Sequence, residues 1–265
     1  MTIPVALTIA GSDSGGGAGI QADLKTFHAF GVFGTSAVTA ITAQNTRGVS
    51  AVHAVPGDIV RAQVHAIATD FEVRACKTGM LATRELVQLV ASLIDQERLP
   101  NYVLDPVMVA TSGDRLLAED AEAAIAELLL PRCAIVTPNL EEAAVLAGLD
   151  VRDEAGMRRA AQALIERGAV AVLVKGGHLP GDRIMDLLFD GQEFLEFPRA
   201  RIRTSSTHGT GCTLSAAITA GLAHGRDLRA SVTLALQFVE RAIREAPPGL
   251  GHGHGPLNHF VKVSS

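Results

Sequence analysis

Short apolar runs rich in β-branched residues alternate with amphipathic helical segments along this chain, and this alternation constrains its fold more than any other feature. The runs lie at residues 5–10, 37–42, 75–78, 102–104, 134–137 and 169–174. Apolar residues at helical spacing follow several of them, at 20–30, 85–97 and 157–167. Parallel strands need such crossover helices, which then cover both faces of the sheet. The pattern therefore predicts a three-layer α/β/α fold with a mostly parallel central sheet.

The later part of the chain departs from this alternation. Two short strand-like runs, 184–189 and 193–197, flank Asp190-Gly191, which is typical of a hairpin, and we expect it at the edge of the sheet. Two long helices, about 212–222 and 228–244, are expected to complete the fold. The chain has no repeat and no linker, so residues 1–265 are predicted to form a single domain.

Charge and composition exclude several classes of protein. The formal net charge of −5 leaves no electrostatic footprint for nucleic acid or for an anionic membrane. The uncharged run 204–225 is long enough to span a bilayer, but it is full of Ser, Thr, Gly and His, so we do not predict a membrane helix. The apolar run 3–10 has no basic region before it and does not resemble a signal peptide. Three widely spaced cysteines without a C-x-x-C motif indicate reduced thiols and a cytoplasmic protein.

Polar or glycine-rich segments follow the predicted strands directly. Ligands of open parallel sheets bind outside the carboxyl ends of the strands, so these segments are the candidate site. The segments are 11–19, 44–45, 105–106, 138–142, 175–178 and 208–212.

The first glycine loop does not carry a known nucleotide fingerprint. After Gly15 and Gly17 the third position of a G-x-G-x-x-G motif is Ile20, and no Gly-Lys-Ser/Thr follows, which excludes a dinucleotide fingerprint and a P-loop. By itself the loop is equally consistent with a tight turn that lets a helix pack against a strand.

Gly209-Thr210-Gly211-Cys212 precedes a predicted helix. Backbone amides at a helix N-terminus suit a phosphate or a developing oxyanion, and glycines let a ligand come close. The same position is expected to lower the pKa of Cys212, which would make it a proton acceptor or nucleophile. A small buried thiol at the start of a helix is the alternative.

Three further candidates each have a structural alternative. Glu142 could arrange the water shell of Mg²⁺, or it could complete a capping box with Asn139. Asp105 could share the metal site or start a turn with the proline after it. Lys175 would bring an ammonium group to the same edge of the sheet, or simply end a strand in solvent. The glycine-rich spacing of the histidines at 252, 254 and 259 has no fixed geometry and does not predict a metal site.

Six segments in this order resemble the ribokinase-like superfamily, specifically its hydroxymethylpyrimidine/phosphomethylpyrimidine kinase branch in thiamine biosynthesis. The resemblance extends over essentially the whole chain. The segments are AGSDSGGGAGIQADLK (10–25), TAQNT (42–46), DPVM (105–108), TPNLEE (137–142), KGGH (175–178) and THGTGCTLS (207–215).

This resemblance implies a ribokinase-like fold and ATP-dependent phosphorylation of 4-amino-5-hydroxymethyl-2-methylpyrimidine and its monophosphate. It also implies Mg²⁺, leaves a monovalent cation open, and implies a homodimer and, at 110–114, a lid or a phosphate-side loop. The sites that it implies are a base, Cys212, with an anion hole at Gly209, Thr210 and Gly211; ATP contacts at Asn139 and Lys175; metal ligands at Asp105 and Glu142; and pyrimidine contacts at Asp23, Gln44, Met80 and Val107. Sugar kinases of the superfamily have Asp at the position of Cys212, so the thiol favours the vitamin-kinase side.

The resemblance has two departures and leaves two rival functions open. Thr111 stands where many relatives have Lys, and Gly16 replaces a common Ser. A pyridoxal kinase is the first rival, since both substrates are planar rings with a hydroxymethyl group, although Gln44 favours the pyrimidine. A non-catalytic sensor of a pyrimidine or nucleotide is the second rival, and the complete set of Asp105, Glu142, Lys175 and Cys212 argues against it.

Overall fold

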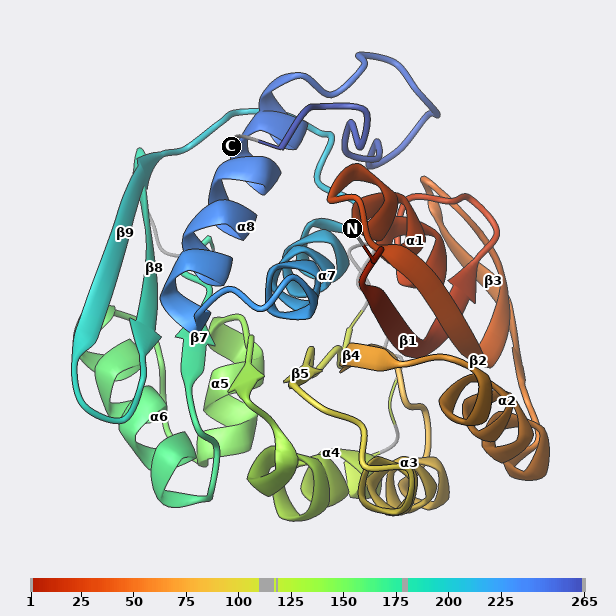
Figure 1. Cartoon of the computed structure of the whole chain (residues 1–265). Helices are drawn as coiled ribbons and strands as arrows, with labels where there is room; N and C mark the ends of the chain where they lie inside the picture. Colours follow the sequence, from red (N-terminus) through yellow and green to blue (C-terminus); the bar gives the residue numbers. More distant parts are fainter. Residues whose placement is uncertain (1, 110–116, 118, 178–180, 264–265) are drawn as a thin grey trace.

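The computed structural model describes residues 2–109, 117, 119–177 and 181–263. Within these residues nine strands form one sheet in the order β3-β2-β1-β4-β5-β6-β7-β8-β9 (Figure 1). The strands are β1 (Val5–Asp13), β2 (Phe33–Asn45), β3 (Gly48–Ala54), β4 (Val73–Thr78), β5 (Tyr102–Leu104), β6 (Ile135–Val136), β7 (Val172–Val174), β8 (Arg183–Phe189) and β9 (Phe194–Ala200).

The strands from β2 to β7 are parallel to one another, and antiparallel pairs lie at both edges. The predicted α/β class and the late hairpin are confirmed. Strands β8 and β9 pair antiparallel, and the Asp190 carboxylate accepts hydrogen bonds from the amides of Gln192 and Glu193 in the turn between them. Gly191 in this turn has a φ of 85°, a conformation that favours glycine.

The helices form two layers, one on each face of the sheet (Figure 1). A π-helical turn, η1 (Ile125–Leu129), and a 3₁₀ turn, η2 (Leu130–Arg132), follow α4. One layer holds α1 (Gly19–Ala29), α7 (Thr210–Ala223) and α8 (Leu228–Arg244), and the other holds α2 (Gly57–Asp70), α3 (Arg84–Gln96), α4 (Glu119–Ala124), α5 (Leu140–Ala147) and α6 (Glu154–Glu166).

Helix α7 explains the long uncharged run of the sequence. Every residue from Thr213 to Ala223 is buried, because the helix packs against α1, α8 and strand β4. A helix that is apolar on all sides belongs in the interior of a protein or in a membrane. In the described part of the chain, no helix combines the length and hydropathy needed to cross a bilayer.

The order of the strands fixes where a ligand can bind. From β1 the chain goes first to β2 on one side, and later to β4 and onward on the other side. Such a reversal opens a crevice at the carboxyl ends of the two central strands. Here that crevice lies beside the glycine loop after β1 and the Gly79-Met80 turn after β4.

Candidate active site

The carboxyl edge of the sheet brings together four side chains that the sequence predicted for one site. The Lys175 ammonium, after β7, lies 3.6 Å from a carboxylate oxygen of Asp105, after β5, and 3.6 Å from one of Glu142 on α5. It also lies against the first turn of α7, since a Cβ added to Gly211 would stand 3.3 Å from this ammonium. The next residue along the helix is Cys212. The predicted convergence of Asp105, Glu142, Lys175 and Cys212 is therefore present.

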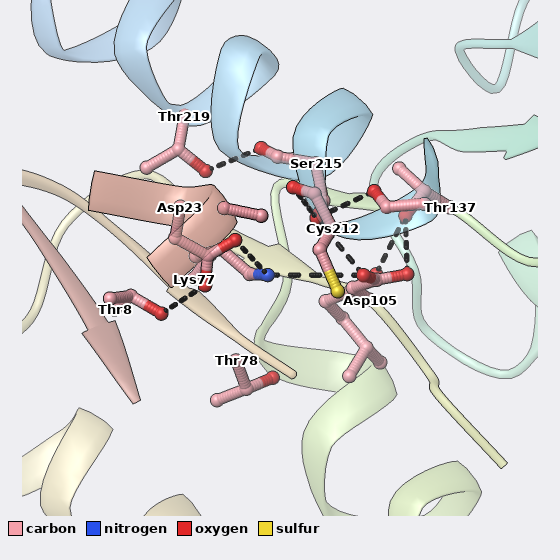
Figure 2. A network of polar contacts seen from close by, with 12 residues as sticks. Thr8, Asp23, Lys77, Thr78, Asp105, Thr137, Cys212, Ser215 and Thr219 are labelled. Carbon is pink, nitrogen blue, oxygen red and sulfur yellow. Dashed lines mark hydrogen bonds and ion pairs between the residues drawn. The ribbon is translucent and has the colours of Figure 1, made fainter. Parts of the chain in front are cut away.

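A second lysine, Lys77 of β4, lies beneath this edge and was not singled out from the sequence. Its side chain is completely buried, and its ammonium is 3.0 Å from Asp23 on α1 and 3.8 Å from Asp105. Figure 2 shows the ammonium between these two carboxylates, with the Cys212 side chain directed toward the same cluster. Burial lowers the pKa of Lys77, but the two carboxylates outweigh it and hold the pKa above its ordinary value. The ammonium therefore stays charged.

Asp23 is placed differently from the prediction that it hydrogen-bonds the pyrimidine. The carboxylate has no exposed surface, and its two oxygens accept hydrogen bonds from the Thr8 hydroxyl (2.6 Å) and from Lys77 (3.0 Å). Because burying an unpaired carboxylate is costly, both bonds stabilise Asp23 in the interior. The geometry favours a role in holding Lys77 and does not support a direct ligand contact.

The loop before α7 has the backbone expected of an anion hole. Gly209 is the N-cap residue with a φ of 82°, and the helix begins at Thr210, two residues earlier than predicted. The hydroxyl of Thr210 donates to the Thr207 carbonyl, which fixes the loop. The amides of the first helical turn have no partner within the helix, so those of Gly211 and Cys212 are available to an anion.

The expectation that the helix N-terminus lowers the pKa of Cys212 was wrong. Burial raises the pKa of this thiol to about 12, and the carboxylates of Asp105 and Asp23 add to the effect. The Lys77 ammonium and the Gly19 amide act in the opposite direction but do not outweigh burial. In this state of the protein the thiol carries its proton at neutral pH.

The residues predicted to hold the pyrimidine flank the first glycine loop. The Ser14 hydroxyl donates to the Gln44 carbonyl and accepts from the Gln44 amide, which ties the end of β2 to this loop. On the other side, a Cβ on Gly11 would stand 3.1 Å from the end of the Met80 side chain. Val107 is half-buried two residues beyond Asp105. Gln44 and Met80 thus each contact the glycine loop, and their binding of a planar heterocycle together with Val107 stays a prediction.

Comparison with known proteins identifies the family. The family model described as phosphomethylpyrimidine kinase matches residues 13–258. The chain belongs to the phosphomethylpyrimidine kinase family. The hydroxymethylpyrimidine/phosphomethylpyrimidine kinase of Rhizobium meliloti is 54% identical over 258 residues, which are 97% of this chain and 97% of that protein.

Solved structures agree with this phosphomethylpyrimidine kinase assignment and confirm the ribokinase-like architecture. An ADP complex of Bacillus subtilis pyridoxal kinase has a TM-score of 0.90 and 40% identity, over 97% of this chain and 98% of that one. A phosphomethylpyrimidine kinase from Clostridium difficile has a TM-score of 0.82 and 39% identity, over 91% of this chain and 100% of that one. The resemblance inferred from the six segments is thus confirmed at the level of family and fold.

Magnesium, which kinases of this family are expected to use, fits the acidic pair at the edge of the sheet. Asp105 and Glu142 are both buried and face the same ammonium of Lys175. Two carboxylates, completed by water and phosphate oxygens, form a donor set that Mg²⁺ prefers. Burial and the Asp105 carboxylate raise the pKa of Glu142, while Lys175 and the Asn139 amide lower it. Asn139 and Glu142 also form the predicted capping box of α5, so this alternative is confirmed and is compatible with a site.

The expected lid at 110–114, with Thr111, lies outside the described residues, as does His178. His252 and His254 are exposed, whereas His259 is buried 2.9 Å from the Thr213 hydroxyl. Ser215 was given no role from the sequence, but its hydroxyl donates to Asp105 (3.1 Å) and ties that carboxylate to α7.

Proposed function

We propose that this chain transfers the γ-phosphoryl group of ATP to the hydroxymethyl group of 4-amino-5-hydroxymethyl-2-methylpyrimidine and, in a second reaction, to the phosphate group of the resulting monophosphate. One observation carries the proposal: the Cys212 thiol and the Lys175 ammonium meet at the N-terminus of α7, beside the Asp105 and Glu142 carboxylates. The curated relative of Rhizobium meliloti bears the name of this activity.

An ammonium group and backbone amides bind the phosphates and compensate their negative charge. The ammonium of Lys175 and the amides of Gly211 and Cys212 bind the transferred phosphoryl group and hold it in line. Asp105 and Glu142 would hold Mg²⁺, which would supply positive charge to neutralise the phosphates. Asn139 keeps Glu142 in place, because the backbone N–H of Asn139 donates to that carboxylate at 2.7 Å.

The glycine loop and the residues beside it bind the acceptor, and Cys212 takes the proton of its hydroxyl group. Gln44 hydrogen-bonds the aminopyrimidine edge, and Met80 and Val107 pack against its ring. The thiolate of Cys212 accepts the hydroxyl proton as the alcohol oxygen bonds to the γ-phosphorus, while the bond from that phosphorus to the bridging oxygen breaks and ADP leaves. Since the thiol is protonated in the ligand-free protein, its pKa must fall when the site fills, and Lys77 and the Gly19 amide already act in that direction.

Product analysis by mass tests the proposal. Incubation with ATP, Mg²⁺ and the hydroxymethylpyrimidine is expected to yield ADP, the monophosphate and then the diphosphate, and chelation of Mg²⁺ is expected to stop turnover. Cys212→Ala should fold, bind ATP and lose about 10²- to 10⁴-fold in kcat. Cys133→Ala is the matched control, because Cys133 is a buried thiol with a pKa also raised to about 12 by burial, remote from the site. Wild-type turnover by Cys212→Ala would remove the thiol from the mechanism.

Pyridoxal kinase is the second candidate function, because the pyridoxal kinase of Bacillus subtilis matches the fold with a TM-score of 0.90. A competition assay with both substrates separates the two activities. Preferential turnover of the aminopyrimidine supports the proposal, whereas efficient turnover of pyridoxal alone overturns it. Tight ligand binding without ADP release would favour the non-catalytic sensor.

The proposal extends to the organisation of the protein. One sheet and both helical layers contribute to the site, which supports a single kinase domain over residues 1–265. A cytoplasmic homodimer is part of the same proposal, as is activation by a monovalent cation. Sedimentation velocity and turnover with and without K⁺ test these two points.

A further inference from the structure

Asp13, the last residue of β1, organises the first glycine loop around its side chain. It is almost fully buried. One carboxylate oxygen accepts from the Gly15 amide (2.8 Å), and the other accepts from the amides of Gly17 (3.0 Å) and Ala18 (2.9 Å). The Asp13 carbonyl accepts from the Gly16 amide as well (2.9 Å). The conformation of residues 14–18 therefore depends on this one carboxylate.

The same carboxylate is bonded to the loop before α7. His208 lies 195 positions later in the chain, is also buried, and has its Nε2 atom 2.8 Å from Asp13. Burial raises the pKa of Asp13, but the hydrogen bonds from His208, Ala18 and Gly15 hold it below its ordinary value. The carboxylate is thus ionised, and since an ionised carboxylate only accepts, Nε2 of His208 is the donor.

Backbone contacts show how closely the two loops fit. A Cβ on Gly209 would stand 1.8 Å from the Gly17 carbonyl oxygen, and a Cβ on Gly17 would stand 2.4 Å from the His208 ring. Neither glycine can be replaced without separating the loops. The Gly19 amide, at the far end of the glycine loop, lies close enough to the Cys212 thiol to lower its pKa. The loops therefore approach each other at both ends of their contact.

We infer that Asp13 and His208 are a positioning pair that sets the distance between the acceptor hydroxyl and the transferred phosphoryl group. The inference rests on the proposed function, in which the glycine loop holds the acceptor and the start of α7 holds the phosphoryl group. His208 reaches neither group itself; it acts through the backbone of the glycine loop. In-line transfer is sensitive to this distance, since a displacement of about 1 Å can cost about 100-fold in rate.

A matched pair of substitutions separates positioning from stability. His208→Gln keeps an N–H donor near the position of Nε2, whereas His208→Asn is one methylene shorter and cannot reach Asp13. The control is His224→Asn, which removes a 2.8 Å histidine bond to the Phe30 carbonyl at the opposite end of α7. Asp13→Asn is a second variant. Both oxygens of Asp13 accept from backbone amides of the glycine loop, so in either orientation the NH₂ group of the Asn side chain faces at least one N–H donor and loses that hydrogen bond.

The readouts are kcat, KM for both substrates, and the ratio of ADP to phosphorylated pyrimidine. For His208→Asn we expect kcat to fall about 10- to 100-fold with smaller changes in KM. We also expect ADP in excess of product, because a displaced acceptor lets water take the phosphoryl group and release phosphate. His208→Gln should recover kcat to within about 5-fold, and His224→Asn should match the wild type. If His208→Asn does not fold, Asp13→Asn is held to the same expectations.

Hydrogen exchange provides a readout that does not need activity. Amides of residues 15–18 should exchange at least 10-fold faster in His208→Asn and at the wild-type rate in His208→Gln and His224→Asn. This arm tests the pair even if the wild type proves inactive on the aminopyrimidine, which would refute only the proposed function. The inference is overturned if His208→Asn keeps wild-type kcat and coupling, if His208→Gln fails to recover them, or if exchange in the glycine loop is unchanged.

Discussion

Replacing Lys77 by Met tests the reasoning about the buried charges most directly. Lys77 is completely buried between Asp23 and Asp105, which are themselves buried. Met has nearly the same length and volume, so the substitution removes the charge and the hydrogen bond and leaves little empty space. What remains is a pair of carboxylates facing each other without a cation between them.

The expected cost follows from this geometry. Removing one partner of a buried ion pair costs about 3–5 kcal/mol, because the other partner stays behind as an uncompensated charge. The 3.0 Å bond to Asp23 places Lys77→Met within this range, whereas an exposed lysine is worth less than about 0.5 kcal/mol. For a domain of this size, each kcal/mol corresponds to about 2–4 °C in Tm.

Urea denaturation followed by circular dichroism measures this cost for Lys77→Met, with Lys262→Met, an exposed lysine, as the control. The double variant Asp23→Asn/Lys77→Met removes both charges of the closest pair and should be more stable than the sum of the two single effects predicts, by about 1–3 kcal/mol. A loss below about 1 kcal/mol for Lys77→Met, at an unchanged m value, would refute the argument that the ammonium is required between the carboxylates.

Two further predictions concern Cys212 and Gly209. Because only the thiolate accepts a proton and the pKa of Cys212 is raised in the ligand-free protein, kcat/KM should increase with pH from about 6 to 9, and Cys212→Ala should lose this slope; a flat kcat/KM profile in the wild type would contradict the base role. Gly209→Ala should destabilise the protein by more than Gly31→Ala, for which we expect a loss of about 1 kcal/mol, and it should also lower kcat. Both glycines have a positive φ, but only at Gly209 would the new Cβ meet backbone, at 1.8 Å. Equal stability losses in the two variants would argue against the close contact of the two loops.

Most of the fold could be predicted because burial leaves a pattern in the sequence. The central strands are covered on both faces, so they read as continuous apolar runs, and α3 and α6 present one apolar face each. Strand β3 could not be found in this way. All but two of its residues are exposed, so no alternation of apolar and polar residues marks it, and its existence depends on pairing with β2.

The location of the site was also predictable, but the distribution of charge inside it was not. That loops after parallel strands converge follows from topology alone, and this was enough to bring Asp105, Lys175 and Cys212 together. A signal for Lys77 was present, since a lysine inside the apolar run 75–78 needs a buried partner. That partner is Asp23, which lies 54 positions earlier and was assigned to the ligand instead.

Burial is the largest cause of the raised pKa of Cys212, since it disfavours the charged thiolate. The carboxylates of Asp23 and Asp105 add to this effect, and the Lys77 ammonium opposes it without outweighing burial. The proton therefore stays on sulfur. The dipole of α7 favours the thiolate, but its contribution is smaller than the cost of burial. Sequence position alone could not predict this result, because it depends on burial and on charges from three separate segments of the chain, those of Asp23, Lys77 and Asp105. It also means that the thiol can act as a base only when the charge around it changes, and binding of the substrates is the event that changes it.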